Sequence, residues 1–193
     1  MRTRRIILAS SSPRRKRLLA MLGVKFSVLA PNIKEDTLHL SPERLATTLA
    51  EKKVYSVAGK IKNGIIIGVD TIVAINNKIL GKPQSKKDAR KMLKLLSNKT
   101  HRVISGLVIL ALPENKVLKT HEITKVTFRK LSSQEIENYL KTNEPYDKAG
   151  AYGIQGIGGQ FVKQIDGCYY NVVGLPITKL IRALKKFGVR IGT

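Results

Sequence analysis

The first segment of the chain whose residue types could do chemistry is residues 10–17. It runs through three serines, one proline and four cations. Hydroxyls, loop N–H groups and arginine forks are groups that bind phosphate oxygens. The first turn of a helix normally favours acidic residues because the helix dipole is positive there, so four cations contradict that preference and indicate an anion site. The alternative is a capped helix with a basic, solvent-exposed face.

A second segment places Asp70 and Thr71 directly after the apolar run 65–69. An acidic residue at the end of a buried strand lies where α/β sheets place their sites. Such a carboxylate could bind a divalent metal or activate a water molecule. The alternative is an aspartate that ends the strand and caps a turn. Because the chain has only 13 acidic residues, one beside an apolar strand favours the functional interpretation.

Two further segments could contact a ligand. Lys82 lies between Gly81 and Pro83, where its ammonium group could neutralise a phosphate, although Gly and Pro also mark ordinary turns. Residues 144–159 are rich in glycine, which lets a backbone approach a ligand closely. Gln155 in this stretch can both donate and accept hydrogen bonds, which suits the edge of a nucleobase. The alternative is a glycine-rich hairpin with a structural glutamine.

The elements that would position these segments alternate between strands and helices. Serine caps and first-position prolines predict helix starts at residues 13 and 42, and a Ser132–Glu135 capping box predicts a third. The strand over 65–69 ends at Asp70 or continues through 72–75 into a hairpin. Two long hairpins interrupt the alternation, which favours a mixed α/β sheet over a purely parallel one. We expect strands over 4–9, 25–30, 103–112 and 116–129, helices over 13–22, 41–60, 85–96, 132–141 and 176–187, and strand-like pieces within 150–173.

The amino-acid composition limits the classes to which this protein can belong. The 193 residues are 42% hydrophobic, which is typical of a globular chain rather than a disordered one. A net charge of +23 would attract nucleic acids, nucleotides or acidic membranes, but the cations are scattered, which favours a solvated surface. Cys168 is the single cysteine, so no intrachain disulfide can form. No apolar run approaches the roughly 18 residues of a membrane span, and we expect a soluble cytoplasmic protein.

Taken together, these segments resemble the Maf family of nucleoside triphosphate pyrophosphatases, and the resemblance runs nearly end to end. Each motif is modest, but their order and spacing are specific. The motifs are Leu8-Ala9-Ser10-x-Ser12-Pro13-Arg14-Arg15, Gly68-Val69-Asp70-Thr71, Lys82-Pro83, Ser97-x-x-Thr100-His101-x-Val103, Glu144-Pro145-x-Asp147-Lys148-Ala149-Gly150-Ala151-Tyr152-x-Ile154-Gln155-Gly156 and Asn171-Val172-x-Gly174-Leu175-Pro176.

The resemblance implies a reaction and a fold. The reaction is hydrolysis between the α and β phosphates of a nucleoside triphosphate, which releases the monophosphate and pyrophosphate. The fold is α/β and similar to that of inosine triphosphate pyrophosphatases: one domain over 1–193, with a long, twisted, mixed sheet flanked by helices in two lobes around a central cleft. The resemblance also implies a divalent metal, magnesium or manganese, and a homodimer.

Residue roles carry over from the resemblance position by position. Asp70 matches the family's proton acceptor, and Asp70 with Glu35 would hold the metal. Positions tied to substrate choice fall on Arg14, Thr71 and Gln155. Other positions that line the family's cleft fall on Ser10, Arg15, Glu35, Lys53, Lys82 and Asp147, with Lys52 as the adjacent alternative to Lys53.

The sequence Ile154-Gln155-Gly156 resembles the branch of the family that hydrolyses dTTP and UTP. The branch that handles 7-methyl-GTP carries a serine–glutamate pair there. Gln155 could pair with O4 and N3–H of uracil or thymine, and modified pyrimidines stay open as substrates. Two alternatives remain. One is a nucleic-acid-binding protein, for which the chain has no recognised motif and no basic arm. The other is a Maf-like protein of cell division without strong catalysis.

Overall fold

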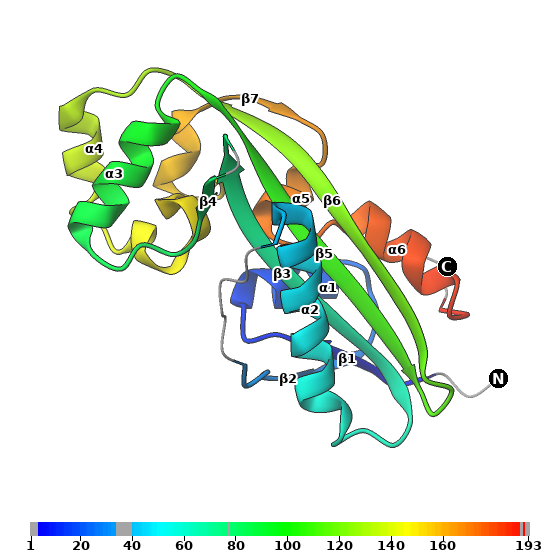
Figure 1. Cartoon of the computed structure of the whole chain (residues 1–193). Helices are drawn as coiled ribbons and strands as arrows, with labels where there is room; N and C mark the ends of the chain where they lie inside the picture. The colour runs from blue at the N-terminus through cyan, green and yellow to red at the C-terminus, as the bar shows by residue number, and fades with distance from the viewer. Residues whose placement is uncertain (1–3, 34–39, 77, 190, 192–193) are drawn as a thin grey trace. The chain divides into compact units, whose positions relative to one another are not determined.

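The computed structural model describes residues 4–33, 40–76, 78–189 and 191 (Figure 1). Within them, seven strands form one sheet in the order β2-β1-β3-β5-β6-β7, and β4 pairs with β3. The strands are β1 (Ile6–Ala9), β2 (Phe26–Leu29), β3 (Gly64–Ile75), β4 (Lys78–Leu80), β5 (Thr100–Leu112), β6 (Lys116–Phe128) and β7 (Val162–Asp166). The α-helices are α1 (Pro13–Ala20), α2 (Pro42–Ala58), α3 (Lys86–Leu96), α4 (Ser133–Tyr139), α5 (Tyr169–Val173) and α6 (Ile177–Lys185), and the 3₁₀ helices are η1 (Glu144–Asp147), η2 (Ala149–Ala151) and η3 (Ile157–Phe161).

Strand pairing confirms the mixed α/β class. β1 lies parallel to both β2 and β3, and these strands are joined through α1 and α2. β3 runs antiparallel to β4, and β6 runs antiparallel to β7. Parallel strands need a crossover connection, whereas antiparallel neighbours can follow a short turn, so the alternation of elements and the hairpins both follow from the chain order.

Serine side chains begin four of the helices. Ser12, Ser41, Ser85 and Ser132 each accept a hydrogen bond from the backbone N–H three residues further on, at the starts of α1, α2, α3 and α4. Each bond satisfies one of the N–H groups that a helix start leaves without an intrahelical partner. The predicted capping box between Ser132 and Glu135 is present. Local residue chemistry therefore fixes these helix starts.

The chain divides into two compact units. Unit 1 comprises Met1–Asp70, Ser105–Glu122 and Gly174–Thr193, and unit 2 comprises Thr71–Ile104 and Ile123–Val173. Unit 1 has a core of aliphatic side chains from β1, α2, β3 and β5, with Ile7, Val54, Ile66 and Val108 fully buried. The boundary between the units falls inside β3, between Asp70 and Thr71.

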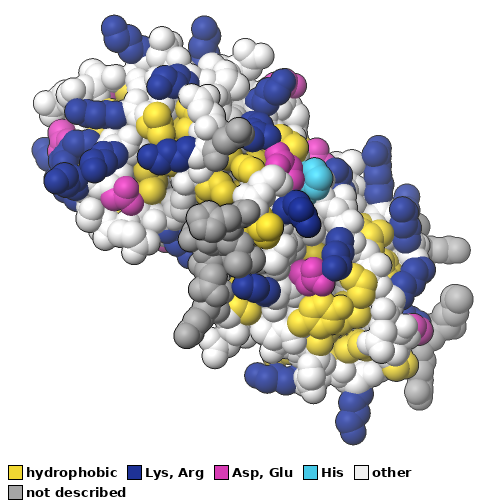
Figure 2. Space-filling view, in the orientation of Figure 1, with side chains coloured by type: hydrophobic (Ala, Val, Ile, Leu, Met, Phe, Trp, Pro, Cys, Tyr) yellow, Lys and Arg dark blue, Asp and Glu magenta, His cyan; other side chains and the backbone are white. Residues whose placement is uncertain are grey.

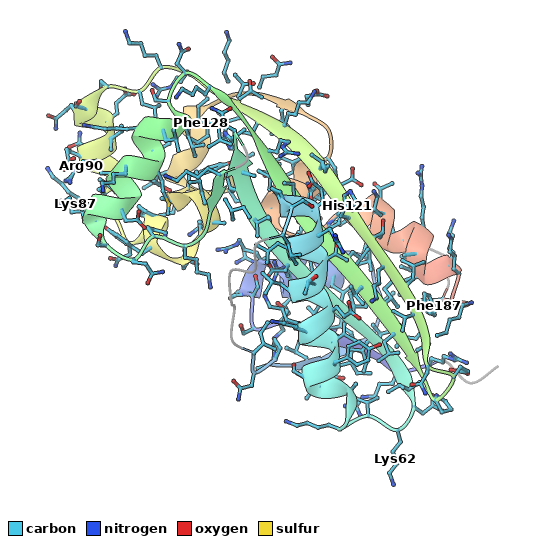
Figure 3. All side chains as sticks on the ribbon, viewed as in Figure 1. Lys62, Lys87, Arg90, His121, Phe128 and Phe187 are labelled. Atoms are coloured by element: carbon cyan, nitrogen blue, oxygen red, sulfur yellow. The ribbon has the colours of Figure 1, made fainter. Side chains whose placement is uncertain are left out.

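Unit 2 has a core rich in aromatic rings. Phe128, labelled in Figure 3, meets His101 and Tyr152 edge to face, with ring centroids 5.0 and 4.8 Å away. His101 Nε2 lies 2.9 Å from the Tyr152 hydroxyl. Burial lowers the pKa of His101 to about 4, so this imidazole is neutral at physiological pH.

The structure decides one open alternative and corrects one sequence prediction. Of the two alternatives for the strand that contains residues 65–69, the structure confirms the continuation: β3 runs without a break to Ile75, so Asp70 lies inside the strand. Residues 150–173, predicted to hold strand-like pieces, contain one strand, β7, while η2, η3 and α5 take most of the remainder. A strand buried on both faces has no alternation that would mark its end. Glycine-rich sequence permits 3₁₀ turns as readily as a hairpin.

Cationic side chains are spread over the face displayed in Figure 2. Lys87 and Arg90 lie on α3 (Figure 3), and Arg90 forms an ion pair with Glu137 of α4. The scattered arrangement agrees with a solvated basic surface. In the described part of the chain, no helix has the length and apolar character needed to cross a membrane.

Candidate active site

Asp70 and Lys53 form a buried ion pair in unit 1. Asp70 is 6% exposed on β3, and Lys53 is 7% exposed on α2. Lys53 Nζ donates to Asp70 Oδ1. Isolated buried charges are very costly, and the mutual attraction of this pair offsets part of that cost. Lys53, rather than its neighbour Lys52, is therefore the residue that contacts the candidate proton acceptor.

The register of α2 on β3 explains how this pair forms. Ala46, Ala50 and Lys53 are spaced to share one face of α2, while Gly68 and Asp70, two residues apart, share one face of β3. A Cβ atom on Gly68 would lie 2.4 Å from the Ala50 carbonyl oxygen. The absence of a side chain at Gly68 thus lets the helix backbone rest directly on the strand, and one helical turn further Lys53 reaches Asp70.

Gly106 on β5 allows a similar close approach of the α2 backbone. A Cβ atom there would lie 2.2 Å from the Ala46 carbonyl oxygen. Two glycines on neighbouring strands of the sheet therefore accommodate successive turns of α2. A glycine inside an apolar strand is the sequence signal that could have indicated this approach.

The serine–arginine turn after β1 is the other organised part of unit 1. Ser10 is buried, and its Oγ accepts hydrogen bonds from the Ser12 N–H at 3.2 Å and from Arg15 Nη1 at 3.5 Å. Arg15 Nε donates to the Gly174 carbonyl at 2.9 Å, which fixes the guanidinium plane. The first turn of α1 holds no acidic residue, as predicted, and Arg14 there is half-buried.

Four other predicted site residues belong to unit 2. Thr71 is half-buried on β3, whereas Lys82, Asp147 and Gln155 are exposed. The Gly150 N–H donates to the Gly81 carbonyl at 3.1 Å, so the turn of Lys82 is joined to the 144–159 stretch. Lys148 Nζ, next in the chain, forms an ion pair with Asp147.

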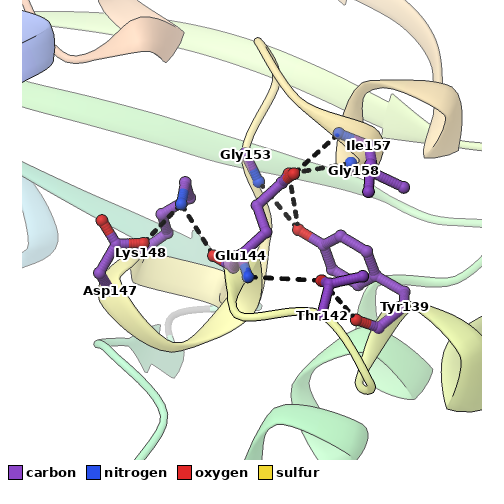
Figure 4. A network of polar contacts seen from close by, with 8 residues as sticks. All are labelled: Tyr139, Thr142, Glu144, Asp147, Lys148, Gly153, Ile157 and Gly158. Atoms are coloured by element: carbon purple, nitrogen blue, oxygen red, sulfur yellow. Dashed lines mark hydrogen bonds and ion pairs between the residues drawn. The ribbon is translucent and has the colours of Figure 1, made fainter.

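Glu144 is a residue whose role the sequence interpretation missed. Its carboxylate accepts hydrogen bonds from the Ile157 N–H at 2.8 Å, the Gly158 N–H at 3.0 Å and the Tyr139 hydroxyl at 3.0 Å (Figure 4). Burial, followed by the charge of Glu144, raises the pKa of Tyr139, so Tyr139 is a neutral donor. The available signal was an acidic residue at the start of a glycine-rich stretch, whose backbone N–H groups need acceptors.

The predicted metal ligands are Asp70 and Glu35, and Glu35 lies outside the described residues. Among the residues that are described, no group of three or more His, Cys, Asp or Glu side chains could hold a metal ion. Mg²⁺ is commonly bound through one or two carboxylates together with the phosphates of a substrate. The carboxylate of Asp70 is a donor that fits that mode of binding.

Comparison with known proteins places the chain in a family. The family profile described as "Maf-like protein" matches residues 5–187. This chain belongs to the Maf family. A protein named dTTP/UTP pyrophosphatase from Carboxydothermus hydrogenoformans is 47% identical over 184 residues, which cover 95% of this chain and 99% of that protein.

Two further relatives carry the same name. The Aquifex aeolicus protein is 46% identical over 98% of both chains. The Clostridium botulinum protein is 49% identical over 96% of this chain and 98% of its own. Among solved structures, "The structure of the Staphylococcus aureus Ham1 protein" is 13% identical and has a TM-score of 0.48 over 82% of this chain and 79% of that chain.

Proposed function

We propose that this Maf family member hydrolyses dTTP and UTP to the nucleoside monophosphate and pyrophosphate and so removes these nucleotides, or modified pyrimidine nucleotides, from the pool. The relatives named dTTP/UTP pyrophosphatase support the substrate. The buried Lys53–Asp70 pair is the structural observation that carries the chemistry, because a carboxylate held in place inside the sheet suits a general base.

In the proposed reaction, Asp70 accepts a proton from a water molecule that attacks the α phosphorus. The bond from that phosphorus to the bridging oxygen breaks, and pyrophosphate leaves with the electron pair. Lys53 holds the Asp70 carboxylate. Phosphate oxygens are bound by cations and hydroxyls, which meet the charge that develops on the leaving group. The residues proposed for this task are Ser10, Arg14, Arg15, Lys53 and Lys82.

Base recognition is assigned to Gln155 and Thr71 in unit 2. The amide of Gln155 can donate to O4 and accept from N3–H of uracil or thymine. A cytosine ring presents the opposite pattern, an amino group and an acceptor nitrogen. Gln155 is exposed on its loop, which agrees with a side chain that meets a ligand rather than the core.

A divalent metal, magnesium or manganese, would be held by Asp70 and Glu35. When bound, it would neutralise phosphate charge and polarise the phosphorus centre. A homodimer and a cytoplasmic location also belong to this proposal. The scattered positions of the cations along the sequence favour a solvated basic surface over a dedicated nucleic-acid interface.

A pyrophosphate-release assay with magnesium tests the proposal across dTTP, UTP, CTP, dATP and GTP. We expect the monophosphate and pyrophosphate in equal amounts, with dTTP and UTP preferred. Release of the diphosphate and inorganic phosphate would contradict the proposed reaction. Steeply salt-dependent binding to DNA without hydrolysis would instead support the nucleic-acid alternative, and neither activity would support a non-catalytic Maf-like protein.

A further inference from the structure

The loop that carries Gln155 is anchored on both sides by groups beneath it. On one side, the Gly153 N–H donates to the Tyr139 hydroxyl at 3.3 Å. On the other, the N–H groups of Ile157 and Gly158 donate to the Glu144 carboxylate. Tyr139 and Glu144 are themselves joined by a hydrogen bond of 3.0 Å (Figure 4). The anchors thus form one network beneath the turn 153–156.

The fit between this loop and Glu144 leaves no room for a side chain at Gly156. A Cβ atom there would lie 2.2 Å from Glu144 Oε2. At Gly158, a Cβ atom would lie 2.7 Å from the Tyr139 hydroxyl. The Gly156 N–H donates to the Gly153 carbonyl at 3.3 Å, which closes the turn that contains Gln155. Glycine at position 156 is therefore explained by the position of the Glu144 carboxylate, and glycine at position 158 by the Tyr139 hydroxyl and the Gly153 backbone.

Glu144 is itself held by local contacts. Its N–H donates to Thr142 Oγ1 at 3.3 Å, and its carbonyl accepts from Lys148 Nζ at 2.8 Å. Hydrogen bonds to a charged acceptor are about twice as strong as those between neutral groups. A carboxylate that accepts three of them is well suited to fix the path of a glycine-rich backbone.

We propose that Glu144 is a positioning residue for Gln155: it sets the backbone of the 153–158 loop, and thereby the place of the Gln155 amide, through hydrogen bonds to Ile157 and Gly158. This inference rests on the proposed function of Gln155 in base recognition. Glu144 acts on the choice of nucleobase and leaves the phosphate-binding residues of unit 1 unchanged.

The test is a double-mutant cycle between Glu144 and Gln155, measured as kcat/KM for dTTP and for dATP. In Glu144→Gln, one amide N–H group would face a loop N–H in place of an acceptor. We expect kcat/KM for dTTP to fall about tenfold, mainly through KM, as the loss of charged hydrogen bonds implies. The value for dATP should change less than about twofold, since dATP does not use the Gln155 contact.

In a Gln155→Ala background, the same Glu144→Gln change should alter kcat/KM for dTTP less than about twofold, because the residue through which it acts is gone. Additive losses, or equal losses on dTTP and dATP, would overturn the inference. Glu137→Gln is the matched control: Glu137 is also a hydrogen-bonded carboxylate in unit 2, but its partner is Arg90, and it should leave both substrates unaffected.

Two further measurements keep the outcome decisive. Hydrogen exchange at the amides of Ile157 and Gly158 should speed up in Glu144→Gln and stay unchanged in Glu137→Gln. Tyr139→Phe removes one of the three hydrogen-bond donors to Glu144 with little change of shape. It should lower the selectivity for dTTP as Glu144→Gln does, but by a smaller factor. If Glu144→Gln does not fold, Tyr139→Phe takes its place in the test.

Failure of the inference and failure of the proposed function are distinguishable. A wild-type protein that shows no preference for dTTP over dATP overturns both. A selective wild-type protein whose selectivity survives Glu144→Gln, or Tyr139→Phe where that variant replaces it, overturns the positioning role alone.

Discussion

Units 1 and 2 hold their candidate site residues in opposite ways. In unit 1, Ser10, Lys53 and Asp70 are buried polar side chains that bond to protein groups. In unit 2, Lys82 and Gln155 are exposed, and the backbone beneath them carries the contacts. The chemistry assigned to unit 1 thus depends on paired charges inside the fold, whereas the recognition assigned to unit 2 depends on how loops are supported.

The units also differ in how they bury ionisable groups. Unit 1 buries a cation beside an anion, so each charge has a partner. Unit 2 buries the imidazole of His101 in its neutral form among aromatic rings. Removal of one partner from a buried charged pair lowers the stability of the fold, whereas a buried neutral base lowers that stability only when acid protonates it in the unfolded chain. This contrast leads to predictions that separate the two units.

The largest effect is expected for Asp70→Asn. If Asp70 is the proton acceptor, turnover should fall ~10³-fold in a pyrophosphate-release assay, since an amide cannot take the proton. The free energy of unfolding should also fall by ~3 kcal/mol, because Lys53 remains buried without its partner. In the Lys53→Met/Asp70→Asn double variant, stability should recover and activity should not. Near-normal turnover in Asp70→Asn would refute the assignment.

Gly68→Ala should damage the same unit through packing. The added methyl group would meet the Ala50 carbonyl and Val54, so α2 must move away from β3. We expect a loss of ~3 kcal/mol in the free energy of unfolding, measured by denaturant titration, and weaker catalysis because Lys53 moves with the helix. Gly59→Ala is the matched control: no atom lies within 4 Å of a Cβ there, and its φ is −60°. Equal stabilities of the two variants would contradict the close approach.

His101 should make unit 2 sensitive to acid. Its folded pKa is lowered to about 4 from 6.5, so between these values the unfolded chain binds a proton that the folded protein does not. Stability therefore rises with pH in this window and is lost on acidification. Between pH 7 and pH 5 the loss should be about 2 kcal/mol.

Chemical denaturation at several pH values measures this loss. His101→Gln, which cannot titrate, should flatten the slope between pH 7 and pH 5. Arg129 and Ser132 lower the pKa of Glu135 to about 2. Protonation of Glu135 therefore changes the free energy of unfolding only below about pH 4.5, outside the range from pH 7 to pH 5. A slope that persists in His101→Gln would locate the acid-sensitive group elsewhere.

These contrasts show where the sequence was informative. Helix starts could be predicted because the caps and first-position prolines act within four residues. The sequence left open whether the strand ended at Asp70 or continued to Ile75, because an apolar run buried on both faces carries no mark of its end. The family resemblance favoured Lys53 over Lys52. The physical reason that Lys53 reaches Asp70 is the close contact of Ala50 with Gly68, and a contact between a helix and a strand cannot be read from the sequence.

The 144–159 stretch was the least predictable part of the site. Gln155 could be singled out from its chemistry, but the 3₁₀ turns around it depend on contacts between Glu144 and amides 13 and 14 residues away. Such contacts have no period that a sequence pattern reveals. The exposed site residues of unit 2 could therefore be predicted from the sequence, whereas the hydrogen bonds that hold their loops could not.

The smallest effect in this comparison is expected for Gln155→Glu, which changes one exposed side chain and no buried contact. A carboxylate there cannot donate to O4 of uracil or thymine and repels it, so kcat/KM for dTTP and UTP should fall about tenfold while stability stays the same. Gln164→Glu, at an exposed glutamine on β7 of the same unit, adds the same charge and should leave the substrate profile unchanged. If Gln155→Glu keeps the wild-type profile across dTTP, UTP, CTP and dATP, base recognition does not depend on this amide. The assignment of catalysis to unit 1 and of base recognition to unit 2 would then be wrong.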